Sequence, residues 1–298
     1  MLSISEIQRF FKGKINLSEA LGRYSLLKIG GPADYFFEPV SKEDATKLFC
    51  YLRNHAIPFI IVSSGSNMFV SDAGYRGAAV SLERGLAHLQ TIGELVVAEG
   101  GVRIAQLVDY CIQHSLQGTE MLAGFPGSIG GDVATRAGIF IDELSEHMVE
   151  AEVLRDNKTV RISGGEIQSD SDFVLNASFS FPRGDKEDLT RRRREFLLRR
   201  NAERPLNVPN AGALFKNPSG DLAANLIERA GLKGHKCGGA MISEQHPNHV
   251  VNTGGARATD VLALIKVVQH AVKKQFHISL ELELRPVGFD HQVLAEVA

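Results

Sequence analysis

The sequence predicts an α+β protein built from two domains. The chain has 298 residues, which is enough for two domains of ordinary size. Short apolar runs of strand length alternate along it with segments of helical periodicity. Pro182-Arg183-Gly184-Asp185 interrupts this pattern and precedes a charged stretch. We therefore expect a first domain over residues 1–184 and a second over residues 185–298.

Helices and strands are both expected in the first half of the chain. Residues 1–20 indicate a short amphipathic helix and a connector. Ser41 is expected to cap a helix, with Asp44 completing a capping box, because such side chains accept hydrogen bonds from first-turn amides. A second helix is expected over 103–115, where apolar residues recur at helical spacing. Apolar runs and alternation predict strands at 58–62, 78–82, 95–98, 149–154 and 173–181.

The second half opens with a charged helix over about residues 186–203. Its run of four arginines, Arg191 to Arg194, lies among acidic residues and indicates a solvated helix face. A further helix is expected to stop at Gly231, a residue type common just after helix ends.

The last hundred residues contain a strand over 249–252 and a helix that Thr259 is expected to cap. A final strand is expected over Ser279–Leu284, with its leucines facing inward. Glu281 and Glu283 then share the other face, because side chains alternate along a strand.

The densest glycine stretch runs from Gly118 to Gly138. Glycines so closely and unevenly spaced suit neither a helix interior nor a strand interior. They suit a chain that turns repeatedly and offers backbone N–H groups to phosphate oxygens. The alternative is a loop that needs glycine only for its turns.

A second candidate phosphate loop, Ser63-Ser64-Gly65-Ser66-Asn67, follows the apolar run Phe59-Ile60-Ile61-Val62. Neither stretch has the Gly-x-Gly-x-x-Gly pattern of nicotinamide-binding folds, and neither ends in the Gly-Lys-Ser/Thr of a Walker loop. Two non-standard phosphate loops in one chain indicate a dinucleotide that is held in another way.

Composition narrows the protein class. Hydrophobic residues make up 44% and charged residues 23%, and the formal net charge is −2. These values are typical of a globular protein with no field that would attract nucleic acid. Cys50, Cys111 and Cys237 lack the spacing of a disulfide framework or a metal site, so no metal is expected. No signal segment or membrane span is found, so we expect a cytoplasmic protein, either a monomer or a weak homodimer.

Six short motifs follow one another in a fixed order over about residues 22–288. They are Lys28-Ile29-Gly30-Gly31-Pro32-Ala33, Gly65-Ser66-Asn67, Ala123-Gly124-Phe125-Pro126-Gly127-Ser128-Ile129-Gly130-Gly131, Phe215-Lys216-Asn217-Pro218, Ala230-Gly231-Leu232-Lys233-Gly234 and Ile242-Ser243-Glu244-Gln245-His246. In order and spacing they resemble the UDP-N-acetylmuramate dehydrogenase family, also called UDP-N-acetylenolpyruvoylglucosamine reductase (MurB).

The resemblance implies an FAD-binding domain of the vanillyl-alcohol-oxidase (PCMH) type with two α/β lobes, followed by a smaller α+β substrate domain. It implies that NADPH reduces the FAD, which then reduces an enolpyruvyl ether of UDP-N-acetylglucosamine. This step belongs to the synthesis of the peptidoglycan precursor. The implied partner is therefore a small UDP-sugar.

The resemblance also implies site residues. The cofactor-binding set is Ile29, Gly30, Ser63, Ser64, Gly65, Ser66, Asn67, Gly124, Pro126, Gly127, Ser128, Gly130 and Gly131. The substrate-binding set is Arg136, Asn217, Lys233, Ser243, His246 and Asn248. The catalytic set is Glu283 and Lys216. Bland alternatives remain for several of them: a solvent-facing strand carboxylate for Glu283, turn chemistry for Asn217, and backbone satisfaction for Asn248.

Four departures from the family pattern bear on activity. Ala213 stands where the family has a serine or cysteine that delivers a proton. The Tyr-Arg-x-Ser segment that carries the family's arginine is missing between Gly165 and Phe173. Arg136 replaces the usual asparagine, and Ser63 and Ser64 replace glycines. Arg136 can restore positive charge, and Ser66, Ser243 or a water can supply a proton.

Three functions stay open at this point. The first is the family's reductase with a relocated proton donor, which whole-chain resemblance favours. The second is a flavin enzyme for another substrate, and the third is a protein that holds FAD or a UDP-sugar without turnover. The paired losses at Ala213 and before Phe173 favour the second and third.

Overall fold

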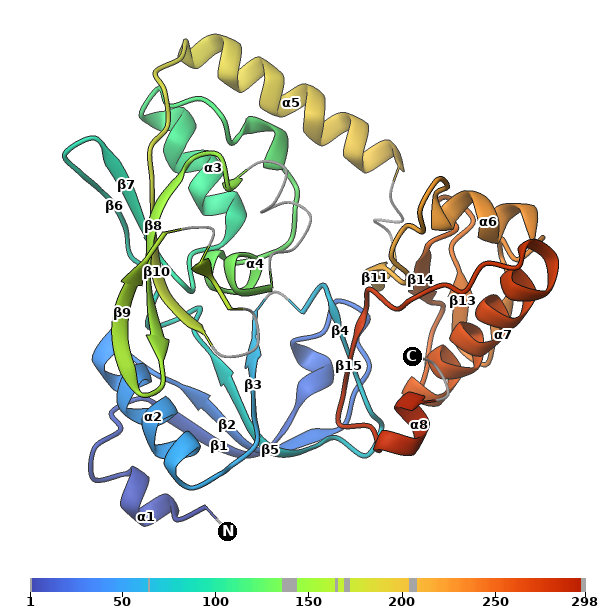
Figure 1. Ribbon diagram of the computed structural model, residues 1–298, viewed down its shortest axis with the longest axis horizontal. Coiled ribbons are helices and arrows are strands. Elements are labelled where there is room, and N and C mark those ends of the chain that lie inside the picture. Colours follow the sequence, from blue (N-terminus) through green and yellow to red (C-terminus); the bar gives the residue numbers. More distant parts are fainter. Residues whose placement is uncertain are drawn as a thin grey trace. The chain divides into compact units, whose positions relative to one another are not determined.

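A computed structural model describes residues 2–63, 65–135, 144–163, 166–168, 172–203 and 208–295, without the side chains of 134, 135 and 203. The chain forms two compact units (Figure 1). Unit 1 comprises Met1–Leu17, Tyr35–Ser64 and Gly77–Arg200, and unit 2 comprises Ser18–Asp34, Gly65–Arg76 and Asn201–Ala298. The expected limits 1–184 and 185–298 stay a prediction.

The first sheet has the strand order β1-β2-β5-β3. Its strands are β1 (Lys14–Ala20), β2 (Pro32–Glu38), β5 (Tyr75–Ser81) and β3 (Phe59–Val62), and the last two run parallel. Helix α2 (Lys42–Asn54) begins as predicted, because Ser41 Oγ accepts from the Asp44 amide at 3.1 Å. The short helix α1 (Ile4–Ile7) was expected, but strand β1 replaces the expected connector. As an edge strand it carries no fully buried residue, so its sequence lacks an apolar alternation.

An antiparallel five-stranded sheet forms the second half of unit 1. Helices α3 (Ile104–Gln113) and α4 (Ile129–Thr135) contribute to the buried core on one of its faces (Figure 1). The 3-10 helix η2 (Glu120–Leu122) lies between them. In spatial order the strands are β6 (Leu89–Ile92), β7 (Leu95–Glu99), β10 (Phe173–Phe179), β8 (Met148–Arg155) and β9 (Lys158–Ile162).

The charged helix α5 (Lys186–Glu203) has the predicted bounds. Its arginine run is only partly a solvated face. Arg191 pairs within the helix with Asp188 and Glu195. Arg192 and Arg193 reach other elements of unit 1, at 3.2 Å from Glu120 and 2.6 Å from Asp109.

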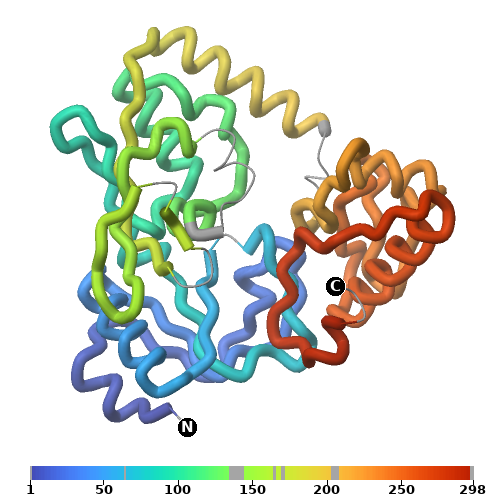
Figure 2. The backbone as a smooth tube through the Cα atoms, viewed as in Figure 1, coloured from blue at the N-terminus to red at the C-terminus, as the bar shows by residue number. Residues whose placement is uncertain are grey.

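Unit 2 is built around an antiparallel sheet with the order β11-β14-β13-β12. The last part of the chain, orange to red in Figure 2, supplies this sheet and the helices α6 and α7, which share its core. Strand β15 (Arg285–Val287) pairs in parallel with β4 (Met68–Val70). The remaining elements are η1 (Leu21–Arg23), β11 (Asn210–Ala213), α6 (Ala223–Arg229), β12 (Lys236–Cys237), β13 (Ala240–Ile242), β14 (His249–Asn252), α7 (Ala258–Phe276) and α8 (His291–Ala295).

Two expectations for unit 2 are wrong. Helix α7 is not capped by Thr259, which lies inside it. Asp72, far away in the sequence, accepts from the amides of Ala258 and Thr259 at 2.8 and 3.2 Å, so part of the cap is a tertiary contact. The local part is Asp260, which accepts from the Arg257 amide at 3.0 Å. Residues Ser279–Leu284 do not form a strand, since only an isolated bridge joins Leu282 to Phe215.

The part of the chain that the structure describes contains neither a membrane-spanning helix nor a metal-binding cluster. None of the helices there combines the length and apolarity that a bilayer span requires. No group of three or more metal-binding side chains comes together in the same part of the chain.

Candidate functional site

The glycine-rich stretch is not a free loop throughout, because α4 begins inside it. Gly130 and Gly131 lie in this helix, which corrects the expectation that these glycines suit no helix. A Cβ at Gly130 would lie 2.8 Å from the carbonyl oxygen of Gly100. The helix therefore packs so closely against the backbone at Gly100 that only glycine fits at this position.

The backbone amides at the start of α4 are largely used by the protein itself. Ile129 and Gly130 donate to the carbonyl oxygens of Val102 and Gly100 at 2.9 and 2.7 Å. The Gly131 amide donates to Ser128 Oγ at 3.3 Å. Recognition of an anion here would depend on side-chain hydroxyls more than on these amides.

Two serine hydroxyls meet where β3 ends and α4 begins. Ser63 Oγ donates to Ser128 Oγ at 2.8 Å. Ser128 Oγ thus accepts two hydrogen bonds, from Ser63 and from the Gly131 amide, and its own hydrogen is left for another acceptor. A hydroxyl oriented in this way suits a phosphate oxygen. Ser63 therefore adds a side-chain hydrogen bond to the loop.

Gly131 keeps this hydroxyl pair uncovered. A Cβ there would lie 3.2 Å from Ser63 Oγ and 3.4 Å from Ser128 Oγ. We define Ser63, Ser128 and Gly131 as the hydroxyl cradle. Its two hydroxyls and bare backbone fit a pyrophosphate group.

A carboxyl group lies beside the cradle. Cβ atoms tilt toward the start of a helix, and the Asp132 side chain accordingly points back over Gly127. A Cβ at Gly127 would lie 2.1 Å from Asp132 Oδ2, so the carboxyl fills that space. Burial raises the pKa of Asp132 to about 7. The sequence analysis missed Asp132; the available signal was an acidic residue directly after paired glycines.

Helix α5 covers the start of the same loop. The Arg200 guanidinium stacks on the Phe125 ring, 3.1 Å from its centroid. Gly124 has a φ of +77°, and a Cβ there would lie 2.9 Å from Leu197 Cδ1. Gly124 is thus explained by its backbone conformation and by α5, before any ligand is considered.

The cofactor residues expected in unit 2 have packing roles of their own. Gly65 has a φ of +67°, and a Cβ there would lie 1.8 Å from the Tyr24 carbonyl oxygen. Ile29 is buried in the unit 2 core, and Gly30, with a φ of +131°, packs against Val70. All three carbonyls of the Gly65-Ser66-Asn67 segment accept backbone hydrogen bonds, from Leu26, Gly212 and Arg285 respectively. Ser64 and Arg136 lie outside the described residues.

The expected catalytic residues of unit 2 gather around one turn. The Glu283 amide donates to the Leu214 carbonyl at 2.9 Å, which brings Glu283 beside Ala213. The Lys216 amide donates to the Glu281 carbonyl at 2.9 Å, and the Lys216 ammonium lies 3.4 Å from the Glu281 carboxylate.

Two asparagines of the expected substrate set serve the backbone. Asn248 Nδ2 donates to the Phe215 carbonyl at 2.8 Å, and Asn248 Oδ1 accepts from the Phe215 amide at 3.0 Å. Asn217 Oδ1 accepts from the Ala223 amide at 3.1 Å, at the start of α6. Both asparagines therefore fix the turn that presents Lys216.

Ser243 and Lys233, two further residues of the expected substrate set, lie in different parts of unit 2. Ser243 is buried and its Oγ accepts from the amides of Gln245 and His246 at 3.2 and 3.1 Å. Lys233 lies apart, after α6, with its ammonium 3.2 Å from the Glu228 carboxylate.

Sheet register adds a histidine that the sequence analysis did not place. Ala213 pairs with His249 across β11 and β14, and the Ser243 amide donates to the His249 carbonyl at 2.9 Å. Side chains opposite each other on neighbouring strands share a face. His249 is buried, and its ring lies 4.3 Å from that of His246. The available signal was a histidine at the first position of the predicted strand 249–252.

Arg155 holds the segment before Phe173 in place. Arg155 donates to both carboxylate oxygens of Asp172 at 2.7 Å, and to the Glu166 carbonyl at 2.9 Å. The Gln168 amide also donates to Asp172, at 2.8 Å. These bonds anchor both ends of the described part of this segment.

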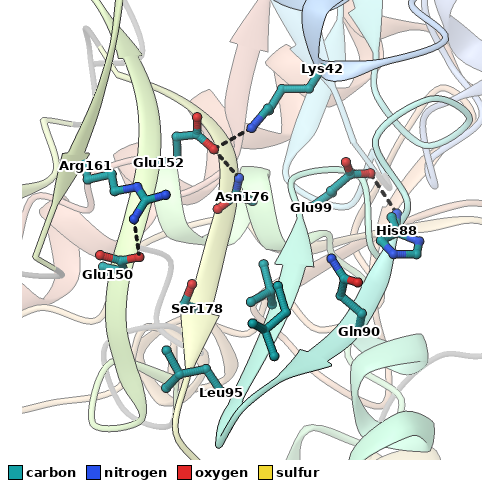
Figure 3. A pocket seen from close by; sticks show the side chains of 12 residues that line it. Lys42, His88, Gln90, Leu95, Glu99, Glu150, Glu152, Arg161, Asn176 and Ser178 are labelled. Atoms are coloured by element: carbon teal, nitrogen blue, oxygen red, sulfur yellow. Dashed lines mark hydrogen bonds and ion pairs between the residues drawn. The ribbon is translucent and has the colours of Figure 1, made fainter.

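A polar hollow of about 360 Å³ lies on the open face of the five-stranded sheet (Figure 3). Its charged groups satisfy one another. Glu152 lies 2.7 Å from Lys42 and accepts from Asn176 at 2.5 Å, while Arg161 lies 3.6 Å from Glu150. Such pairing is typical of the solvated face of an antiparallel sheet.

Comparison with known proteins identifies the family. Residues 33–167 match the family model described as "FAD binding domain", and residues 204–287 match "UDP-N-acetylenolpyruvoylglucosamine reductase, C-terminal domain". The UDP-N-acetylenolpyruvoylglucosamine reductase of Chloroherpeton thalassium is 38% identical over 309 residues, covering 98% of this chain and 99% of the relative. That of Caldanaerobacter subterraneus subsp. tengcongensis is 37% identical over 287 residues, covering 93% and 95%.

A solved structure agrees with these relatives. The UDP-N-acetylenolpyruvylglucosamine reductase of Thermus caldophilus has a TM-score of 0.77 and 29% identity, covering 93% of this chain and 100% of that chain. The expected α+β architecture, an FAD-binding domain followed by the family's C-terminal domain, is confirmed, and FAD is the cofactor. The chain belongs to the UDP-N-acetylenolpyruvoylglucosamine reductase family of FAD-dependent oxidoreductases.

Proposed function

We propose that the protein reduces UDP-N-acetylglucosamine enolpyruvate to UDP-N-acetylmuramate, with NADPH as the reductant of FAD. The observation that carries this proposal is the alignment with a reductase of that name over 98% of this chain and 99% of the relative. The alignment leaves very little of either protein unmatched.

The chemistry sets what the chain must supply. FAD, when bound, would supply the hydride-transfer chemistry that links the reductant to the enol ether. Hydride addition pushes negative charge toward the substrate carboxylate, so a cation near that carboxylate and a proton for the neighbouring carbon both lower the barrier. The protein's own residues must also hold the cofactor and the UDP group.

The hydroxyl cradle of unit 1 is the proposed seat of the FAD pyrophosphate. Ser128 Oγ already accepts from Ser63 and from the Gly131 amide, so its hydrogen can be donated to a phosphate oxygen. Ile29, Gly30 and the segment Gly65-Ser66-Asn67 stay predicted cofactor-binding residues of unit 2.

Lys216 and Glu283 are the proposed catalytic residues of unit 2. The two asparagines that hold the Phe215 turn keep Lys216 in place, and the Lys216 ammonium is shared with Glu281 rather than buried. It can therefore turn to a substrate carboxylate at little cost in solvation. Glu283 lies beside residue 213, where the proton is needed.

His249 is the proposed source of the proton that Ala213 cannot give. It is the direct cross-strand neighbour of Ala213, and opposite residues in antiparallel strands have Cβ atoms about 4.5–5.5 Å apart. An imidazole is long enough to bring its proton near the position of the missing hydroxyl. Ser243, whose amide donates to the His249 carbonyl, keeps its own hydroxyl hydrogen and is an alternative proton source. Ser66, whose carbonyl accepts from Gly212, is the remaining alternative.

The direct test monitors the absorbance spectrum of the bound flavin under anaerobic conditions. Flavin in the purified protein is reduced with NADPH or, separately, with dithionite, and UDP-N-acetylglucosamine enolpyruvate is then added. We expect the oxidised flavin spectrum to return, and to stay absent with UDP-N-acetylglucosamine, which lacks the enolpyruvyl group. If dithionite reduces the flavin and NADPH does not, NADPH is not the reductant. No reoxidation in a flavin-loaded protein would remove the reductase function.

The second candidate is a diverged member that acts on another substrate, or that holds FAD or a UDP-sugar without turnover. Ala213 favours it, because loss of general-acid catalysis alone costs about 10²–10⁴ in rate. A change in the oxidised flavin spectrum on adding UDP-sugars, without any reoxidation of reduced flavin, would support it.

A further inference from the structure

Asp132 is an unusual neighbour for a phosphate site. Although the residue as a whole is half-buried, its Oδ2 atom is shielded from solvent and makes no hydrogen bond within the described part of the chain. The side chain reaches over Gly127, directly before Ser128 of the hydroxyl cradle. A shielded oxygen without a partner, lying over the residue that precedes Ser128, points to a ligand group that is still to be bound.

Among the described residues that pack around it, none gives this carboxyl a compensating charge. Helix α4 packs against β10 and β7. Strand β10 contains no ionisable side chain, and Glu99 of β7 accepts from the His88 amide. Arg103, which bridges to Ser128, turns its guanidinium to Glu83. Burial alone raises the pKa of Asp132 to about 7, so near neutral pH a large fraction is protonated.

Ionisation decides what Asp132 does to an anion. A protonated carboxyl has one O–H donor, which a phosphate oxygen can accept. An ionised carboxylate would repel the same phosphate, in a site where burial weakens the screening by water. We propose that Asp132 is a cofactor-binding residue that donates a hydrogen bond to the FAD pyrophosphate as a neutral carboxyl, so that this chain binds FAD more tightly at acidic than at alkaline pH. The inference rests on the pyrophosphate lying at the hydroxyl cradle, as in the proposed function.

The direction of the effect follows from linkage. A bound anion favours the protonated form, so binding raises the pKa of Asp132 further. Below its pKa in the free protein, FAD meets a carboxyl that is already neutral, and affinity is constant. Above it, each binding event must take up a proton, and the dissociation constant rises by up to tenfold per pH unit.

The test measures FAD retention by the full-length protein. FAD-loaded protein is diluted, equilibrated between pH 6 and 9, and ultrafiltered, and free FAD is measured by fluorescence. For the wild type we expect a constant dissociation constant up to about pH 7 and a rise of at least tenfold by pH 9. Asp132→Asn keeps an N–H donor of similar size without a charge, so it should bind FAD with a flat profile. Asp132→Ala should also give a flat profile, at weaker affinity.

The outcomes separate this inference from the proposed function. A flat wild-type profile, or the same slope in wild type and both variants, overturns the role of Asp132 and leaves FAD binding untouched. Failure to retain FAD at any pH overturns both. Riboflavin, which lacks the pyrophosphate, should show no pH dependence in the same assay. A riboflavin slope equal to that of FAD would assign the effect to the flavin ring and overturn the inference. Circular dichroism checks that each variant is folded, and if Asp132→Asn is not, Asp132→Ala decides.

Discussion

Gly124 and Gly130 belong to one glycine-rich stretch, yet each is glycine for a different reason. Gly124 needs a positive φ and lies under α5, whereas Gly130 sits in a helix that touches the Gly100 carbonyl. Glycine spacing in the sequence cannot separate these causes. Glycine marks where the backbone closely approaches another group, and for these two glycines that group belongs to the protein itself.

Gly130→Ala tests the packing explanation through the sign of its effect. Alanine is favoured over glycine inside a helix by up to about 1 kcal/mol, so without a clash it would stabilise the fold. With a Cβ 2.8 Å from the Gly100 oxygen, we expect instead a loss of about 1–3 kcal/mol. Urea unfolding followed by circular dichroism measures it. Gly212→Ala, whose Cβ would meet only the Ser66 oxygen at 3.5 Å, is the control. A more stable Gly130→Ala would contradict the explanation.

The Arg155–Asp172 pair gives a second prediction for a single side chain. Removing one partner of a buried pair leaves an uncompensated charge, and Asp172 is buried. We expect Arg155→Ala to lower the unfolding free energy at pH 7 by clearly more than the control does, because it leaves the Asp172 carboxylate buried and unpaired. The control is Arg161→Ala, which breaks an exposed pair with Glu150 and should cost less than about 1 kcal/mol. Equal losses in the two variants would show that the buried pair does not anchor this segment.

The same pair predicts a pH dependence. Burial works to raise the pKa of Asp172, but hydrogen bonds from Arg155 and the Gln168 amide hold it below its usual value. A lowered folded-state pKa contributes stability above the unfolded value, about 3.9, and that stability is lost as pH falls through the folded-state value. The difference between wild type and Arg155→Ala should therefore shrink below about pH 4. A difference that stays constant down to pH 3 would be at odds with this assignment.

At the scale of elements, register decides which side chains meet. The apolar pattern places a strand at 249–252, but only its pairing with β11 puts His249 opposite Ala213. In the same way, α7 is predicted from its stripe, whereas part of its cap comes from Asp72, which lies before it by almost 200 residues in sequence. Periodicity identifies elements, and long-range pairing assigns their neighbours.

A double substitution tests the pairing of Ala213 with His249. His249→Gln should slow reoxidation of reduced flavin by the enolpyruvyl substrate by about 10²–10⁴, the usual contribution of a general acid. In an Ala213→Ser background the new hydroxyl can supply the proton, so the loss should fall to within about tenfold. His270→Gln, on the exposed side of α7, should change little in either background. Equal losses from His249→Gln in both backgrounds would assign His249 a structural role.

At the scale of the whole molecule, the two compact units are both built from several separate chain segments. Unit 1 and unit 2 each take residues from before and after position 65, so neither is a simple half of the chain. Cofactor binding to such a fold should stabilise the native state of the full chain by mass action.

Removal of FAD should therefore lower the thermal stability of the protein. Free FAD at 100 times its dissociation constant should add about 2.7 kcal/mol to the unfolding free energy, and the midpoint should rise further with concentration. Thermal unfolding by circular dichroism over a series of FAD concentrations measures this. Riboflavin at the same concentrations is the control for the pyrophosphate contribution. An unchanged midpoint at saturating FAD would contradict native-state binding.

Local pattern was enough to predict several elements of this fold. Helix α5 has its predicted bounds, and α2 begins at its predicted Ser41 cap, because capping and helical periodicity depend on neighbours in the sequence. Two predictions were wrong: a connector where edge strand β1 lies, and a strand over residues 279–284. Strand pairing and exposure are not local properties, so neighbouring residues do not reveal them. Short motifs likewise predicted the family, which the relatives confirm along the whole chain.

The sequence by itself determined the class of cofactor, the family and most elements, because motif order and periodicity are read from neighbouring residues. The tertiary structure decided which groups share a site. It joined Ser63 to Ser128, turned Asp132 back over Gly127, and set His249 beside Ala213. These contacts depend on how strands and helices from distant segments pack, and a chain read one residue at a time carries no direct signal of that packing.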